Sequence, residues 1–333
     1  RQRFVTLLAL LFALLCLQVR VAARAESNAT ASAMDLVILI DDSKSMYDKK
    51  EENNTKKGSD PDQYRREAAA IMLNMCEVRT SRAAVLSFGD DPRDLAPEGQ
   101  SYDGGLISIS GDQLDNRRKM IQQINSHAYK YENTDVGTAI SRAAELFTDS
   151  GTVQGNQRVI LLISDGRPYL PGGDPYAVGG AAAIAAVKNN PLFSPDNPDR
   201  IRLYMVVLNV NGVEASNLSA YKTMQAYSDG FIYKVKDASE LPDRFTDILA
   251  QQIGSRLLGS NLNAYDLGDG RSGIKIRIPN QSVREVNLLI NTKDIDAKSV
   301  RLYKPPAAGQ TLGEEAVEDG KSLFYNRTKN FVQ

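Results

Sequence analysis

The stretch LVILIDDSKSM, residues 36–46, places five apolar residues directly before two aspartates and two serines. A short apolar run without polar alternation is typical of a strand that is buried on both faces of a parallel sheet. Such a strand needs no carboxylates or hydroxyls for its own packing. Oxygen atoms at its end therefore indicate a binding site at the edge of the sheet.

The same kind of apolar run recurs along the chain and alternates with helical patterns. We expect strands over 35–40, 82–89, 106–110, 158–164, 202–210 and 231–235, and helices over 63–79, 112–126, 135–150, 176–190, 216–228 and 239–257. This alternation predicts a doubly wound, mostly parallel α/β sheet with helices on both faces. The predicted domain covers residues 34–258, and its ligands should bind where the strands end.

Composition limits the kinds of function that the chain can have. Lys plus Arg number 40 and Asp plus Glu number 41 among 333 residues, so no excess of positive charge indicates a nucleic-acid or membrane-surface partner. His127 is the only histidine of the sequence, which excludes a site built from several imidazoles. We expect His127 at a helix end or on the surface, and Cys76 as a buried, unreactive side chain.

The first residues have the pattern of a secretory leader. Two arginines precede an apolar run over residues 4–19, and an Ala-x-Ala pattern ends at Ala25. The run is shorter than the roughly 20 apolar residues of a membrane-spanning helix. We therefore expect residues 1–25 to be a signal peptide, or alternatively an N-terminal anchor, followed by a linker over 26–33. A leader implies a secreted or cell-surface protein, attached to a membrane only through that anchor or through a missing C-terminal segment.

The pattern changes after the predicted α/β domain. Residues 259–273 are rich in Gly, Asn and Asp, which predicts a linker. Strand patterns without a helix between them follow over 274–279, 284–291 and 299–305. We expect residues 274–333 to form part of a β-sandwich-like domain that the sequence does not complete.

Five oxygen-bearing side chains form a candidate metal site. Asp41, Ser43 and Ser45 are spaced by two, so in an extended loop they point to the same side. Thr134 precedes a predicted helix and Asp165 ends a predicted strand, which places both on the same edge of a doubly wound sheet. Ligands that offer only oxygen favour a hard divalent cation, above all Mg²⁺.

Three motifs, in this order, resemble those of von Willebrand factor type A (VWA) domains. LVILIDDSKSM resembles the first strand and the D-x-S-x-S motif of that family, NTDVGTAI (133–140) its T-x-x-G helix start, and VILLISDG (159–166) its strand ending in Asp-Gly. The resemblance implies a metal-ion-dependent adhesion site (MIDAS) with the ligands Asp41, Ser43, Ser45, Thr134 and Asp165. Lys44 departs from the family, in which glycine often stands between the two serines, but that position is not a ligand.

The resemblance also implies a function. In this family the ion binds a carboxylate of a protein partner, and no reaction is catalysed; Mg²⁺ or Mn²⁺ is expected, and Ca²⁺ fits less well. Asp42, Lys44 and Arg167 neighbour the ligands in sequence and are candidate contacts to the partner. The helix over 239–257 is expected to shift when the partner binds. We thus expect a divalent-cation-dependent adhesion or protein-binding module whose protein ligand presents an acidic group.

Other interpretations stay open. Some domains of this fold are scaffold or assembly subunits that act with an ATPase partner, and a degenerate site would leave only a scaffold. Haloacid-dehalogenase-like phosphatases also begin with a strand followed by Asp, but Ser43 stands where their second Asp would be and cannot shuttle protons at neutral pH. The charged tract over 47–62 is a candidate partner contact, although we expect it to be a solvated loop.

Overall fold

The computed structural model of the chain divides into two compact units, residues 32–249 and residues 1–31 with 250–333. It describes residues 19–25, 33–51, 54–76, 80–110, 113–127, 130–151, 153–208, 218–242, 244–245, 248, 256–260, 265–268, 270–276, 283–291, 296–304, 307–308, 310, 312–316 and 331–332.

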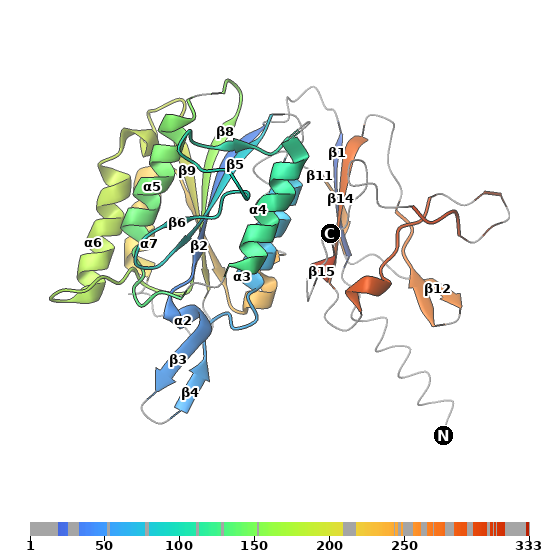
Figure 1. The fold of residues 1–333 in the computed structure, drawn as a ribbon, viewed down its shortest axis with the longest axis horizontal. Coiled ribbons are helices and arrows are strands. Elements are labelled where there is room, and N and C mark those ends of the chain that lie inside the picture. The colour runs from blue at the N-terminus through green and yellow to red at the C-terminus, as the bar shows by residue number, and fades with distance from the viewer. Residues whose placement is uncertain are drawn as a thin grey trace. The chain divides into compact units, whose positions relative to one another are not determined.

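A seven-stranded sheet forms the centre of the larger unit (Figure 1). Its order is β10–β9–β8–β2–β5–β6, with β7 also paired to β5. The strands are β2 (Met34–Asp41), β5 (Arg82–Phe88), β6 (Arg93–Asp94), β7 (Ile107–Ser108), β8 (Gln157–Ser164), β9 (Ile201–Leu208) and β10 (Phe231–Val235). The five longer strands are parallel, as the bare apolar runs predict. Strands of a parallel sheet are apolar on both faces because helices cover both faces of the sheet.

The helices form a layer on each side of this sheet. Helices α3 (Tyr64–Met75) and α4 (Leu114–Ser126) lie on one side, and α5 (Val136–Asp149), α6 (Pro175–Lys188) and α7 (Ser219–Ser228) lie on the other (Figure 1). Short 3-10 turns follow at η2 (Pro191–Phe193) and η4 (Ala238–Glu240). No helix among the described residues is long and apolar enough to cross a membrane. The predicted doubly wound α/β fold is confirmed.

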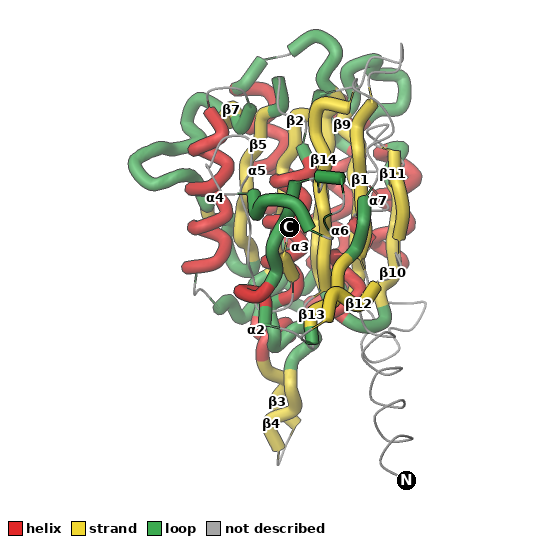
Figure 2. The backbone as a smooth tube through the Cα atoms, turned by 90° about the vertical axis from the view of Figure 1, so that its right-hand side faces the viewer, coloured by secondary structure: helices red, strands yellow, loops and turns green. Residues whose placement is uncertain are grey.

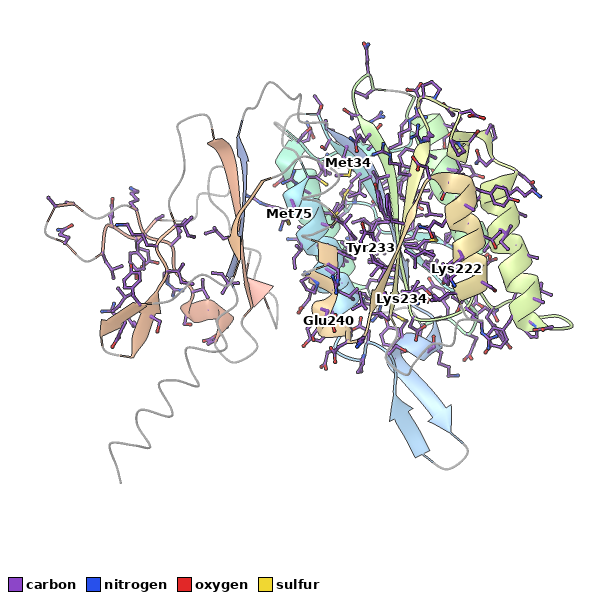
Figure 3. The ribbon with its side chains drawn as sticks, turned by 180° about the vertical axis from the view of Figure 1, so that it is seen from behind. Met34, Met75, Lys222, Tyr233, Lys234 and Glu240 are labelled. Atoms are coloured by element: carbon purple, nitrogen blue, oxygen red, sulfur yellow. The ribbon has the colours of Figure 1, made fainter. Side chains whose placement is uncertain are left out.

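A β-hairpin replaces part of the loop that we expected over 47–62. The chain leaves β2 through the single turn α2 (Lys44–Tyr47), and β3 (Asp48–Glu51) then pairs with β4 (Asn54–Lys57). The hairpin projects from the larger unit in two perpendicular views (Figures 1 and 2). Figure 3 labels Met34, at the start of β2, at the end of the unit away from the hairpin. The hairpin and the carboxyl end of β2 therefore share one edge.

The predicted helix over 239–257 needs a correction at its end. The described residues 241–242, 244–245 and 248 are helical, but β11 (Arg256–Ser260) already begins at Arg256. Arg256 and Leu257 pair with a neighbouring strand of the smaller unit. The helical periodicity of the sequence thus extends beyond the residues that are helical in the fold.

The smaller unit contains strands from both sides of the larger one in sequence. A four-stranded antiparallel sheet has the order β11–β1–β14–β15, with β1 (Val19–Ala25), β14 (Val283–Asn291) and β15 (Phe331–Val332). A separate hairpin joins β12 (Tyr265–Gly268) to β13 (Arg271–Gly273), inside the predicted linker, and η5 (Ala297–Ser299) follows β14. Strand β1 comes from the last seven residues of the predicted leader, so cleavage at Ala25 would remove it from the mature protein.

A buried network of charges sits behind the carboxyl end of β2. Asp42 Oδ1 accepts hydrogen bonds from Arg65 Nη2 and from the Tyr47 hydroxyl, both at 2.7 Å. Asp42 Oδ2 accepts from the Ser87 hydroxyl at 2.7 Å and lies 2.8 Å from Nε2 of His127. The side chains of Asp42 and Arg65 are fully buried. The structure therefore corrects the expectation that Asp42 contacts a partner. His127 lies at the end of α4, as one of the two expectations for it had it, but it is buried and not on the surface.

The network also ties α3 to the loop that follows β2. Arg65 Nη1 donates to Asp60 Oδ2 at 2.9 Å, so one guanidinium joins two buried aspartates. Asp60 in turn accepts from the backbone N–H groups of Tyr64 and Arg65, where the first turn of α3 has no intrahelical acceptors. The start of α3 is fixed to residues 42 and 60 by these bonds.

A close contact between α6 and a loop fixes the chain after β8. A Cβ on Gly179 would lie 2.6 Å from backbone atoms of Pro168 and Tyr169. The next residue, Gly180, has room, because its Cβ would meet only Ala220 at 3.6 Å. Glycine at position 179 thus lets the helix approach this loop.

We expect Gly179→Ala to lower the free energy of unfolding by about 1–3 kcal/mol, since a methyl group there displaces backbone. The matched variant Gly180→Ala should instead raise it by up to about 1 kcal/mol, because alanine favours the helix. Urea unfolding followed by circular dichroism measures both. Equal stabilities of the two variants would contradict the close contact.

Asp42→Asn should lower the free energy of unfolding by about 3–5 kcal/mol, since it removes one of the two charged partners of the buried Arg65 guanidinium. Lys44→Met is the control: it breaks the exposed pair of Lys44 with Glu132 and should cost less than about 1 kcal/mol. Urea unfolding of the two variants gives the comparison. A small effect of Asp42→Asn would show that the network contributes little.

The stability should also depend on pH through Asp42. Burial alone would raise the pKa of this carboxyl, but the His127 hydrogen bond and the Arg65 charge hold it well below the ordinary value of 3.8. A carboxyl whose pKa is lowered by folding stabilises the fold above its unfolded-state pKa, and this stabilisation is lost as the pH falls through the folded-state value. Between about pH 4 and pH 2, the wild type should lose more stability than Asp42→Asn. Parallel curves in urea titrations would contradict this.

Candidate metal site

Two carboxylates meet at the carboxyl ends of β2 and β8. These strands are parallel neighbours, and Ile40 pairs with Ile163. Asp41 follows Ile40 as the last residue of β2, and Asp165 follows Ser164, the last residue of β8, so both aspartates lie at the same edge of the sheet. Both side chains are buried, with Asp41 fully inaccessible to solvent. The register of the central strands thus places two acidic groups together, as the sequence predicts.

The loop after β2 joins these carboxylates through its serines. The backbone N–H of Ser43 donates to Asp41 Oδ1 at 2.8 Å, which folds the loop back on the end of its strand. The hydroxyl oxygens of Ser43 and Ser45 lie 3.1 Å apart. Ser45 Oγ donates to Asp165 Oδ1 at 2.7 Å. Four of the five predicted ligands are therefore connected side chain to side chain or through the loop backbone.

The loop before α5, which carries Tyr131 and Thr134, is held to the two other loops of the site by backbone hydrogen bonds. Lys44 N donates to the Tyr131 carbonyl at 2.7 Å, and Tyr131 N donates to the Asp42 carbonyl at 3.1 Å. Thr134 and Tyr169 exchange two N–H···O bonds of 3.0 Å each. This loop is therefore joined through Tyr131 to the loop that carries Ser43 and Ser45, and through the buried Thr134 to the loop that follows Asp165.

Ser164 belongs to the site but was missed by the sequence analysis. Its hydroxyl donates to Asp41 Oδ2 at 2.6 Å, so both oxygens of Asp41 are hydrogen bonded. Ser164 is fully buried as the last residue of β8. The signal that could have identified it is its position: Ser164 directly follows the apolar run over 159–163.

The electrostatics of the two carboxylates are unfavourable without a cation. Burial and the neighbouring Asp165 carboxylate raise the pKa of the Asp41 carboxyl to about 7, despite the hydrogen bonds from Ser164 and Ser43. Asp165 Oδ2 is buried and has no hydrogen-bond partner among the described residues. A buried acceptor without a donor costs about 1–3 kcal/mol. A divalent cation would relieve both penalties, so these residues fit the expected ion.

Tyr221 supports the Asp165 loop from α7. Its hydroxyl donates to the Gly166 carbonyl at 2.6 Å, and its ring is fully buried. Burial raises the pKa of Tyr221 strongly, and the nearby Asp41 and Asp165 raise it further, so its proton stays in place to donate. Tyr221 therefore fixes the backbone immediately after Asp165.

The two cations predicted to contact a partner have different surroundings. Lys44 Nζ lies 2.7 Å from Glu132 Oε1 in an exposed pair. Arg167 lies in the loop after Asp165, with its guanidinium 3.8 Å from the centre of the Tyr176 ring. Both neighbour the candidate ligands in sequence, but among the residues that the structure describes only Lys44 is paired with a carboxylate.

Solved structures with a similar fold share little sequence with the chain. A von Willebrand factor type A protein from Catenulispora acidiphila is 17% identical, with a TM-score of 0.44, over 72% of this chain and 46% of that one. Proximal thread matrix protein 1 from the mussel byssus is 13% identical, with a TM-score of 0.42 in a structure with a zinc-occupied MIDAS motif, over 66% and 47%. A variant of the PilB minor pilin from Streptococcus sanguinis is 14% identical, with a TM-score of 0.50, over 67% and 62%.

The chain spans about half the length of the first two of these proteins. No curated protein matches it. A sequence model of the von Willebrand factor type A domain, however, matches residues 35–247, which include the sheet of the larger unit except for Met34, and all five candidate ligands. The chain therefore belongs to the von Willebrand factor type A domain family.

Proposed function

We propose that the larger unit is a divalent-cation-dependent module that binds an acidic group of a protein partner. The observation that carries this proposal is the buried meeting point of three loops, at which Asp165 Oδ2 lacks a donor and Asp41 has a raised pKa. Family membership supports the same function, since VWA domains are mostly interaction modules and the mussel byssus relative has a structure with a zinc-occupied MIDAS motif.

Each candidate ligand would have a distinct role. Asp41 and Asp165 would supply the negative charge, and the hydroxyls of Ser43, Ser45 and Thr134 would supply neutral oxygens. These donors suit Mg²⁺ or Mn²⁺ better than Zn²⁺, which prefers nitrogen and sulfur, and better than Ca²⁺, which takes six to eight oxygens. The bound ion would be a hard Lewis acid able to take a further oxygen ligand. A carboxylate of a partner is the ligand best matched to it.

The protein around the ligands would hold them in place. Ser164 orients Asp41, Tyr221 fixes the backbone after Asp165, and the Asp42–Arg65 pair anchors the loop that carries the serines. Residues that orient metal ligands commonly change metal affinity about 10- to 100-fold. This arrangement favours a rigid site that is ready for an ion.

The competing functions have weaker support. In the phosphatase interpretation a second aspartate would act as general acid and base, whereas the Ser43 hydroxyl stands there, 3.1 Å from the Ser45 hydroxyl. A scaffold or assembly subunit that acts with an ATPase partner remains the second candidate, and it needs no metal. We propose an adhesion role outside the cell or at its surface, because the sequence begins with a leader pattern and the fold is that of a VWA domain.

Calorimetric titration tests the metal site. Mg²⁺ or Mn²⁺ should bind the wild-type chain, and Asp41→Ala should weaken binding by about 100-fold or more, because it removes a charged ligand. Asp149→Ala, an exposed carboxylate at the far end of α5, is the control and should leave binding unchanged. Equal heats for wild type and Asp41→Ala would favour the scaffold.

A further inference from the structure

The loop that follows Asp165 is held rigidly along its length. The Gly166 carbonyl accepts from Tyr221, and Tyr169 is paired with Thr134 through two backbone bonds. Between them, Pro168 is buried and lies directly against Gly179 of α6. Arg167 therefore projects from a short segment that is fixed on both sides, and both ends of that segment contact the candidate ligands.

Aromatic rings fix the Arg167 side chain as well. Its guanidinium lies over the Tyr176 ring at 3.8 Å, and Tyr176 makes an edge contact with Tyr169, with ring centres 5.3 Å apart. Tyr176 is 44% exposed. A guanidinium stacked on an aromatic face keeps its N–H groups free in the plane of the group. Arg167 is thus a pre-positioned donor at the rim of the site.

The charge of Arg167 has no acidic partner in the part of the chain that the structure describes. The other cation beside the ligands, Lys44, makes bonds of 2.7 and 3.0 Å to the two carboxylate oxygens of Glu132. A solvated arginine needs no explanation by itself. An arginine held by an exposed tyrosine on a fixed loop next to a metal site, with its fork of donors unused, indicates a carboxylate that comes from outside.

We propose that Arg167 is a second acid-binding position, which pairs with a carboxylate close in sequence to the one that the metal accepts. The inference rests on the proposed function, since it assumes that the metal binds the first carboxylate. The partner would then present a segment with two neighbouring acidic residues. The planar guanidinium suits a carboxylate because two N–H groups can donate to its two oxygens in parallel.

Short peptides separate the two positions. We would titrate the Mg²⁺-loaded, isotope-labelled chain, followed by NMR chemical shifts, with acetylated glycine peptides that contain one glutamate. A second series contains two glutamates separated by zero to three glycines. The two-glutamate peptides should bind the wild type about three- to tenfold more tightly than the one-glutamate peptide at one or more spacings.

Three variants assign the preference to a residue. Arg167→Gln should reduce the affinity for two-glutamate peptides to that for the one-glutamate peptide, and should leave Mg²⁺ binding and one-glutamate binding unchanged. Arg167→Lys should keep only part of the preference, because lysine lacks the planar fork. Lys44→Gln, which removes the other nearby cation, should keep the preference intact.

The outcomes distinguish the inference from the proposed function. Binding of the one-glutamate peptide that requires Mg²⁺ and is lost in Asp41→Ala supports the proposed function. If the one-glutamate peptide binds in this way but the wild type does not prefer two-glutamate peptides, only the role of Arg167 is overturned. The same holds if Arg167→Gln retains that preference. If Lys44→Gln and Arg167→Gln lose the preference for two-glutamate peptides equally, the role of Arg167 is also overturned, since the preference would then come from general charge attraction. Failure of every peptide to bind overturns both.

Discussion

The site depends on the register of two neighbouring parallel strands. Since Ile40 pairs with Ile163, β2 and β8 end together, and each end carries an aspartate into a space from which water is excluded. Burial, and then the charge of the neighbouring Asp165, raise the pKa of Asp41. The loop with the two serines bonds to both carboxylates, and the backbone of Thr134 pairs with that of Tyr169 in the loop after Asp165. A divalent cation would offset the negative charge buried there.

The neighbouring Asp42 shows the opposite arrangement one residue later. Its carboxylate is also buried, but it accepts bonds from Arg65, Tyr47 and Ser87, and its pKa is lowered instead of raised. Adjacent aspartates on one strand thus point to opposite sides and meet opposite environments. The Asp42 carboxylate is neutralised within the protein and stabilises the loop, whereas Asp41 accepts hydrogen bonds at both oxygens but keeps a raised pKa, which a cation would lower. This division explains how a charged pair of residues can end a strand that is otherwise apolar.

The sequence predicted the parts of the fold that depend on local pattern. Bare apolar runs located all five long strands within one or two residues, and the spacing of Asp41, Ser43 and Ser45 indicated a shared site because alternate residues face one way. Features that depend on tertiary contacts were out of reach. The buried Asp42 is paired with Arg65 of α3 and with His127 at the end of α4, and neither partner is close to it in sequence. The β3–β4 hairpin depends on a register that its charged residues do not reveal. Strand β11 follows a helical pattern whose end is decided by pairing with β1.

The base of the β3–β4 hairpin has a consequence for variation in this protein. After the hairpin, the N–H groups of Gly58, Ser59 and Asp60 donate in turn to the carbonyls of Tyr47, Ser45 and Met46, and at Gly58 the chain passes so close that a Cβ would lie 2.3 Å from the Tyr47 backbone. These hydrogen bonds therefore close the base of the hairpin. Its tip can lengthen, shorten or change sequence without disturbing the residues beneath it. Related chains can acquire new binding preferences at this point, and an engineer can graft a foreign segment there, while the loop with the two serines keeps its shape.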